Sequence, residues 1–323
     1  MENILLIRLK SIGDVIFTLP AVAAVRDNFP AAKITFLSSK ENAPLLRGFR
    51  GVDTVVTLDR AASHSPLRAA PEVFRLLQRL RAGRFSLTVD FQGFGETAWL
   101  SWWSGASQRW GHVYGPGREW LYTRGIQRNK HIHHADGYLS LLRQCGLRMG
   151  EIHNDFDLPE DAAAEARDFF VGNNLDPGKP TLFLQPFTST PFKNWPLEKY
   201  LELARHFQSW AVQIIFGGGP SERGKLEPAR TAGFTVSAGV PLLVSAGLTR
   251  FSDLIVGGDT GLLHLAVAMK KRVMMLMRPG QTHPFQHPDW ILAPLPGKAI
   301  AEIETRAVIA ACEQALVESS ATK

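Results

Sequence analysis

The chain has 323 residues, of which 45% are hydrophobic and 20% are charged, and it contains only two cysteines. This composition excludes a disordered, fibrous or disulfide-stapled protein and provides apolar material for two hydrophobic cores, in domains of roughly 150 residues each. The formal net charge of +6 favours an anionic partner, such as nucleic acid, a lipid surface or a phosphorylated small molecule, without choosing among them.

The amino-terminal segment is apolar but is interrupted by Arg8, Lys10 and Asp14, which a secretory signal would not tolerate. No later stretch reaches the roughly 20 apolar residues that are needed to cross a bilayer. Cys145 and Cys312 are far apart and lack the spacing of a metal site, which is typical of a protein in a reducing compartment. We therefore expect a cytoplasmic protein.

Short apolar segments that favour β-strands recur between helical patterns. The expected strands cover residues 4–9, 34–37, 54–58, 87–91, 181–185, 212–216, 254–256 and 273–277. The expected helices cover residues 21–28, 71–81, 137–144, 162–171, 197–210, 262–269 and 300–317. Strands separated by helices in this way predict an α/β protein with doubly wound parallel sheets.

Two sets of such units are present, and the polar segment 151–161 is the expected join. We expect one domain over residues 1–155 and a second over residues 156–323, with a last helix that can pack back on the first domain. Ligands of doubly wound sheets bind at the carboxyl ends of the strands. Four loops at these ends carry glycine, hydroxyl or carboxylate groups, and they cover residues 10–14, 185–189, 217–222 and 257–261.

The last of these loops interrupts an apolar strand with Gly-Gly-Asp-Thr-Gly, and a helical pattern begins at once. Exposed amides at a helix start, together with the Thr260 hydroxyl and the Gly261 backbone, form a natural seat for a phosphate or diphosphate. Leu262 would pack this helix down, and His264 would lie one turn in, near the anion. An ordinary strand-to-helix connection with Asp259 as the N-cap explains the same pattern.

The first loop places Asp14 after Gly13 at the start of a helix, where a carboxylate can act either as a general base or as a cap of its own turn. Pro20 indicates that this helix starts late or is kinked.

In the second half, Thr188, Ser189 and Lys193 precede a helix and can converge on phosphate oxygens, although a solvated turn is the alternative. Glu222 follows a glycine cluster that lacks the G-x-G-x-x-G spacing, and it is placed to bind a ribose.

Residues 101–150 carry seven Lys or Arg against two acidic residues, with Trp and Tyr interleaved. This mixture occurs in nucleic-acid grooves and at membrane interfaces, but no nucleic-acid module accompanies it, so we expect no nucleic-acid partner.

Three further motifs resemble known sites without their context. Asp259-Thr260-Gly261 spells the triplet of aspartic proteases, but the chain offers neither a paired second motif nor an all-β frame. Asp155 and Asp157 form a DxD pattern inside the expected join, away from the strand ends. His131, His133 and His134 lack a supporting carboxylate or cysteine framework, so we expect surface residues and no metal.

The segments RLKSIGD, FKNWP, GGGPSE and GGDTGLLHLAVAM, taken together, resemble the lipopolysaccharide heptosyltransferases in order and spacing, over essentially the whole chain. The resemblance implies a GT-B architecture, in which two Rossmann-like domains face each other across a cleft. The first domain would bind a lipid-linked acceptor and the second would bind ADP-heptose. It also implies an inverting transfer of heptose to the lipopolysaccharide inner core without metal or cofactor.

Carried onto this sequence, the resemblance makes Asp14 the general base for the acceptor hydroxyl. It makes Lys193 and the backbone amides of the helix start the groups that neutralise the departing diphosphate. The implied donor-binding residues are Thr188, Ser189, Lys193, Glu222, Asp259, Thr260, Gly261, Leu262 and His264. Ser189 stands where the family commonly has threonine, and this substitution keeps the hydroxyl.

The implied acceptor is an anionic saccharide on a lipid, so the basic first half gains a use. Arg60, Arg118 and Arg124 are candidates for its phosphates or carboxylates, with peripheral contact at the inner face of the inner membrane. A solvated basic face is the alternative. Two other functions also stay open, namely transfer of another nucleotide-activated sugar and a non-catalytic nucleotide-binding accessory role.

Overall fold

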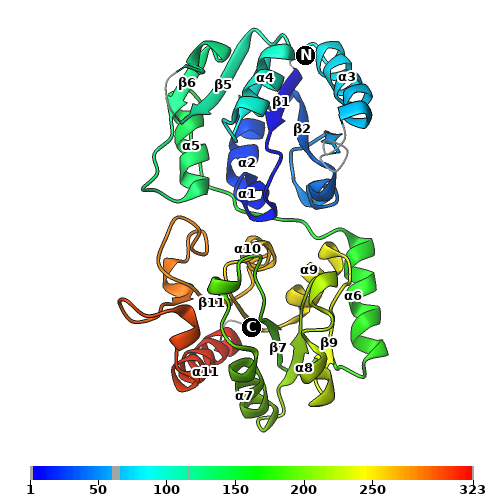
Figure 1. The fold of residues 1–323 in the computed structure, drawn as a ribbon, viewed down its shortest axis with the longest axis vertical. Coiled ribbons are helices and arrows are strands. Elements are labelled where there is room, and N and C mark those ends of the chain that lie inside the picture. Colours follow the sequence, from blue (N-terminus) through cyan, green and yellow to red (C-terminus); the bar gives the residue numbers. More distant parts are fainter. Residues whose placement is uncertain (1–2, 60–65, 115–116, 322–323) are drawn as a thin grey trace. The chain divides into compact units, whose positions relative to one another are not determined.

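The computed structural model describes residues 3–59, 66–114 and 117–321. The chain divides into two compact units, residues 1–157 and 158–323, each of which is built on a six-stranded parallel sheet (Figure 1). This confirms the predicted α/β class with doubly wound sheets. Among the described helices, none has both the length and the apolar character needed to cross a membrane.

The sheet of unit 1 has the order β3-β2-β1-β4-β5-β6. Its strands are β1 Asn3–Ile7, β2 Lys33–Ser39, β3 Thr54–Leu58, β4 Leu87–Asp90, β5 Gln108–Val113 and β6 Arg124–Gln127. Ile4 on β1 is paired with Ile34 on β2 and with Leu87 on β4. The winding reverses between β1 and β4, and doubly wound sheets bind ligands beyond the carboxyl ends of the strands at such a point.

The helices of unit 1 are α1 Ile12–Ile16, α2 Leu19–Asn28, α3 Pro66–Ala82, α4 Gly95–Trp103 and α5 His134–Gln144. Helix α2 packs against α5, and α3 packs against α4. Leu5 and Ile7 of β1 form a core with Leu80 of α3 and Leu100 of α4. Pro20 predicts a helix that starts late or is kinked, and the structure instead divides it into α1 and α2, with this proline in the first turn of α2, where a missing N–H is tolerated.

The sheet of unit 2, ordered β12-β11-β10-β7-β8-β9, repeats the winding of unit 1 with its reversal between β7 and β10. Its strands are β7 Thr181–Gln185, β8 Gln213–Phe216, β9 Thr235–Val236, β10 Leu254–Gly257, β11 Val273–Leu276 and β12 Ile291–Leu292. Its helices are α6 Glu160–Gly172, α7 Leu197–Gln208, α8 Glu227–Thr231, α9 Leu242–Phe251, α10 Gly261–Ala268 and α11 Thr305–Ala321.

The last helix, α11, packs against α7 and contributes Val308, Cys312 and Ala315 to the core of unit 2. It therefore belongs to unit 2, whereas the sequence left open that it packs back on the first domain. The physical reason is its apolar face, which covers alternate residues of β7 and β10 such as Leu182 and Val256.

Short 3-10 helices complete the described elements. They are η1 Lys40–Asn42, η2 Leu45–Gly48, η4 Glu119–Leu121, η5 Pro191–Lys193, η6 Pro220–Glu222, η7 Pro288–Trp290 and η8 Ile300–Glu302. The sequence did not predict β5, β6, β9 and β12, nor the helices α4, α8 and α9.

Candidate active site

Asp14 lies just beyond β1, as the third residue of α1, and its carboxylate folds back on the start of its own helix. Oδ2 accepts hydrogen bonds from the backbone N–H and from the hydroxyl of Ser11, both at 3.1 Å. Ser11 is the N-cap residue, so Asp14 occupies the third helical position of a capping box rather than the cap itself. This arrangement fixes the carboxylate at the carboxyl end of β1.

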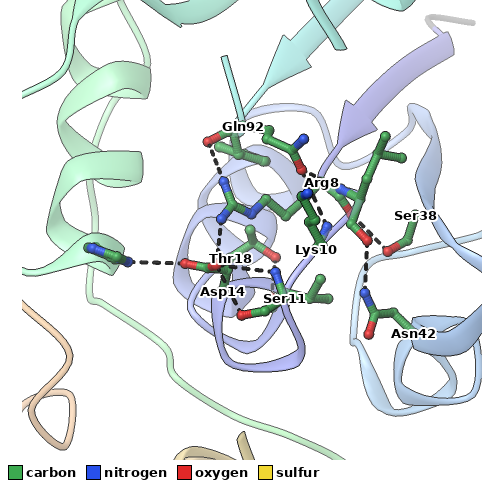
Figure 2. Close-up of polar contacts among 12 residues, drawn as sticks. Arg8, Lys10, Ser11, Asp14, Thr18, Ser38, Asn42 and Gln92 are labelled. Atoms are coloured by element: carbon green, nitrogen blue, oxygen red, sulfur yellow. Dashed lines mark hydrogen bonds and ion pairs between the residues drawn. The ribbon is translucent and has the colours of Figure 1, made fainter. Parts of the chain in front are cut away.

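Two ionisable side chains hold the same carboxylate. Arg8 Nη2 lies 2.7 Å from Oδ2 of Asp14, and His134 Nδ1 lies 3.1 Å from Oδ1. Figure 2 shows the guanidinium of Arg8 beside Asp14. Arg8 directly follows β1, is only 4% exposed, and also donates to the carbonyl of Phe91 at 3.3 Å. The guanidinium that faces Asp14 is therefore held in place by the backbone that follows β4.

The protonation of Asp14 follows from these contacts. Burial raises the pKa of the carboxyl group, but the hydrogen bond from His134, the charge of Arg8 and the Ser11 amide outweigh it, and the pKa lies well below its usual range. Asp14 is thus ionised at neutral pH, as a general base must be, and its side chain stays 22% exposed and accessible to a substrate.

Polar side chains on both sides of β1 fix the loop that carries Asp14. Gln92, beyond β4, accepts hydrogen bonds from the backbone N–H groups of Leu9 at 3.0 Å and Lys10 at 3.3 Å. Asn42 donates to the carbonyl of Leu9 at 2.9 Å from the side of β2, as Figure 2 shows. The loop is therefore held by its neighbours in the sheet.

The expectation that the three clustered histidines are surface residues is wrong for His133, and His134 is only partly exposed. His133 is buried and caps α5 by accepting the backbone N–H of Ala135 at 3.0 Å. His134 begins α5 and reaches Asp14, whereas His131 is exposed. The sequence contained one signal for this site: the histidines lie between a strand and a helix, where ligand-binding loops are found. That signal was missed because the strand, β6, was not predicted.

Asp259 is the corresponding centre of unit 2, beyond β10. Lys193 Nζ lies 2.9 Å from its Oδ2, and His264 Nε2 lies 2.9 Å from its Oδ1. The hydroxyl of Thr282, which the sequence did not identify, donates to Oδ2 at 3.0 Å. Burial raises the pKa of Asp259, but the hydrogen bond and charge of His264, followed by those of Lys193, hold it well below its usual range.

Lys193 and Asp259 line a pocket of about 260 Å³. The other residues that line it are Phe192, Met277, Arg278, Gly280, Thr282, Ala299 and Ile300. The side chain of Lys193 is 39% exposed, so its ammonium is accessible from this pocket. Arg278 adds a second cation that the sequence did not identify. Unit 2 therefore combines two cations and an open volume at the carboxyl ends of its strands.

Helix α10 begins directly after the Gly-Gly-Asp-Thr-Gly loop, as the sequence predicted. Its N-cap residue is Thr260 rather than Asp259, Gly261 begins the helix, and Leu262 is buried. The hydroxyl oxygen of Thr260 is buried and has no hydrogen-bond partner among the described residues. A Cβ atom on Gly258 would lie 2.5 Å from Cγ2 of Thr188, so the loops after β7 and β10 touch each other at this glycine.

Of three predicted donor-binding residues, Thr188 and Glu222 have local contacts in their loops. The Thr188 hydroxyl lies 2.8 Å from the carbonyl oxygen of Thr190 and is buried, whereas Ser189 next to it is exposed. Oε2 of Glu222 accepts the backbone N–H of Gly219 at 2.7 Å and closes the turn of η6. These contacts position the loops, and ligand binding by the three side chains stays a prediction.

The candidate acceptor residues are spread over unit 1. Arg60 lies outside the described residues. Arg118 is exposed and lies against Gly95 at the start of α4. Arg124 is also exposed, and its guanidinium donates to the carbonyl of Cys145 at 2.7 Å. Their contact with an acceptor stays a prediction.

The DxD pattern has a structural role at the end of unit 1. Asp157 forms an ion pair with Arg50, and Phe156 between the two acidic residues packs against Phe49. Within residues 3–59, 66–114 and 117–321, no group of three or more His, Cys, Asp or Glu is arranged to hold a metal ion.

Comparison with known proteins links these observations to one family. Residues 73–293 match the profile of glycosyltransferase family 9 (heptosyltransferase). Lipopolysaccharide heptosyltransferase 1 of Pseudomonas aeruginosa is 28% identical over 288 residues, which cover 86% of this chain and 79% of that protein.

Two solved structures share the fold over nearly the whole chain. The family 9 glycosyl transferase of Veillonella parvula has a TM-score of 0.90 at 19% identity, with coverage of 98% of this chain and 97% of that chain. The Escherichia coli heptosyltransferase WaaC with ADP has a TM-score of 0.77 at 20% identity, with coverage of 97% and 99%. The predicted GT-B fold is therefore confirmed.

Proposed function

Because the chain belongs to glycosyltransferase family 9 (heptosyltransferase), we propose that it transfers a heptose from ADP-heptose to an inner-core acceptor of lipopolysaccharide. The identity of its Pseudomonas relative supports the acceptor class, and the E. coli WaaC structures with ADP and with ADP-2-deoxy-2-fluoro heptose support the donor class. In this proposal unit 1 binds the acceptor and unit 2 binds the donor.

One observation carries the donor assignment, namely the Thr260 hydroxyl, which is buried at the start of α10 without a partner among the described residues. A phosphate oxygen at this helix start would satisfy the hydroxyl together with the backbone amides of Gly261 and Leu262, and the helix dipole would favour its negative charge. Lys193 would contact the same anion. Its ammonium lies 2.9 Å from Oδ2 of Asp259, the residue directly before Thr260.

The proposed reaction proceeds with inversion and in one displacement. Asp14 takes the proton of the acceptor hydroxyl while the hydroxyl oxygen forms a bond to the anomeric carbon. The bond between that carbon and the diphosphate oxygen breaks, and its electron pair leaves with ADP. Lys193 and the amides of α10 stabilise the charge that develops on the diphosphate, which lowers the barrier more than uniform substrate binding would.

The remaining residues take supporting roles in this proposal. Thr188 and Ser189 contact donor phosphates, Glu222 contacts the ribose, and Asp259 with His264 orients Lys193. Arg60, Arg118 and Arg124 contact anionic groups of the acceptor. The reaction takes place in the cytoplasm, with peripheral contact at the inner face of the inner membrane, where a lipid-linked acceptor is accessible.

Titration with ADP, UDP and GDP sugars, followed by transfer assays on inner-core lipopolysaccharide acceptors, tests the proposal. We expect binding of the ADP sugar and release of ADP together with a heptosylated product. Preference for a uridine donor would contradict the donor assignment. Binding of ADP-heptose without turnover on any inner-core acceptor would instead favour a nucleotide-binding accessory role.

A further inference from the structure

Four tryptophans are exposed together on unit 1, and none of them belongs to the site described above. Trp99, Trp102 and Trp103 lie on α4, and Trp120 lies on η4. Their exposed fractions are 51%, 41%, 45% and 59%, in the same order. We call these four side chains the tryptophan face. Single exposed apolar residues are common, but a contiguous group of this size marks an interaction surface.

The four indoles contact each other. The rings of Trp99 and Trp102 are 5.6 Å apart, those of Trp99 and Trp120 are 5.5 Å apart, and those of Trp102 and Trp103 are 6.4 Å apart. Spacings of three and four residues along α4 place the three helical tryptophans on one side of the helix. The face is therefore a property of the fold, since Trp120 joins it from a separate segment.

A hollow of about 510 Å³ adjoins this face between α3 and α4. Trp102 and Trp103 form one wall, and Phe74 and Leu77 of α3 form another. Phe74 is itself 61% exposed. Arg81 and Arg109 also line it, with Gln78 and Gly105, so the hollow combines aromatic and apolar walls with two guanidinium groups.

Arginines flank α4 at both ends. Arg118 lies against Gly95 at the first residue of the helix, where a Cβ atom would be 3.3 Å from its Cζ. Arg81 donates to the carbonyl of Trp103 at 3.4 Å at the last residue. The two helices that carry the tryptophans, α4 and η4, contain the acidic residues Glu96 and Glu119. The tryptophan face is thus an aromatic centre with guanidinium groups at its margins.

We propose that the tryptophan face docks on the surface of an anionic phospholipid membrane. Indoles prefer the headgroup level of a bilayer because they combine an apolar ring with an N–H donor, and nearby arginines gain from anionic lipid phosphates. The inference deepens the proposed function, since it names the surface by which the enzyme reaches a lipid-linked acceptor.

Two other occupants fit these observations less well. A second copy of this chain, docked face to face, would bring the marginal arginines of both copies to one interface, where like charges repel. A single-stranded nucleic acid needs free ring faces on which bases stack, but Trp99 meets both Trp102 and Trp120 edge-on, at interplanar angles of 84°.

Vesicle co-sedimentation of the full chain tests the proposal. We expect binding to phosphatidylglycerol-containing vesicles that weakens with salt, and weaker binding to pure phosphatidylcholine. The double variant Trp99→Ala/Trp102→Ala should lose about tenfold or more in partitioning. Arg81→Gln should lose about fivefold in partitioning onto anionic vesicles and should bind phosphatidylcholine vesicles like the wild type. Trp210→Ala is the matched control, because Trp210 is 55% exposed but lies in unit 2, and it should bind like the wild type.

Two further measurements keep the test decisive. Circular dichroism and a transfer assay on a lipid-free acceptor should be unchanged in the double variant, because no tryptophan of the face takes part in the proposed chemistry. Wild-type binding that is absent, or equal in the double variant, would overturn the inference, as would a change in oligomeric state caused by the double variant. Vesicle binding without any turnover by the wild type would instead remove the proposed function and leave the docking surface.

Discussion

The carboxylate of Asp14 is shared between Arg8 and His134, with a nitrogen of Arg8 2.7 Å from Oδ2 and Nδ1 of His134 3.1 Å from Oδ1. Unit 2 repeats this arrangement, because Asp259 pairs with Lys193 through Oδ2 and with His264 through Oδ1. Both aspartates lie beyond strands at which the winding of their sheet reverses. Asp14 has the more buried cation, whereas Lys193 is open to a ligand.

Replacement of Asp14 by asparagine should abolish general-base assistance while it preserves the shape of the side chain. We expect transfer to fall by about 10²- to 10⁴-fold, with ADP affinity nearly unchanged, because the proposed donor-binding groups lie in unit 2. Steady-state turnover and calorimetric titration with ADP measure the two effects. Asp27→Asn, at an exposed position of α2, is the control. Unchanged turnover of Asp14→Asn would exclude this residue as the base.

Replacement of His134 by alanine should change the pH dependence of transfer. The hydrogen bond from His134 helps to hold the pKa of Asp14 below its usual range, so its loss should raise that pKa. The acidic limb of the kcat/KM profile should then move to higher pH, toward the ordinary value near 4. His131→Ala, at an exposed position of the same cluster, should leave the profile unchanged. An acidic limb that does not move in His134→Ala would contradict a link between the two side chains.

The lowered pKa of Asp259 also predicts how stability depends on pH. A carboxylate whose pKa is lowered by folding stabilises the folded state above its unfolded pKa, near 3.9, and this contribution is lost as the pH falls through the folded pKa. The difference in urea midpoint between the wild type and Asp259→Asn should therefore be constant from pH 7 to pH 5 and shrink below pH 4. A difference that grows on acidification would show that the sign is wrong.

Replacement of Lys193 by methionine tests the diphosphate assignment. Hydrogen bonds to charged groups contribute about 1.5–3 kcal/mol, so ADP affinity should fall roughly 10- to 100-fold. The rate of transfer should fall further, because the charge on the leaving group grows in the transition state. Lys179→Met, at an exposed position of the same unit, is the control for loss of one positive charge. Equal effects of the two variants would mean that only the overall charge matters.

Replacement of Gly258 by alanine tests the contact between the loops after β7 and β10. Its Cβ would lie 2.5 Å from Cγ2 of Thr188 and 3.3 Å from the carbonyl oxygen of Lys193, so the two loops must separate. We expect a loss of about 1–3 kcal/mol in stability and weaker ADP binding. Gly224→Ala has open space around its Cβ and should stay within about 0.5 kcal/mol of the wild type. Normal ADP affinity in Gly258→Ala would show that ADP binding does not depend on the contact between these loops.

The sequence by itself determined the parts of the molecule that are encoded locally. Buried parallel strands are continuous apolar runs, so β7 has the expected bounds, as does the β-branched edge strand β3. The glycine-, hydroxyl- and carboxylate-bearing loops lie at strand ends as predicted. The same local patterns placed Asp14, Lys193 and the start of α10. The family resemblance rested on these segments.

Only the tertiary structure decided which distant segments meet. Strand β5 carries Gln108, Arg109 and His112 among its apolar residues, and β9 and β12 have two residues each, so their strand character comes from pairing with neighbours. Asp14 and His134 are 120 positions apart and meet because α5, which follows the edge strand β6, packs back against α2 near the end of β1. Periodicity reports the environment of one segment, whereas a contact between segments depends on the order in which the strands assemble.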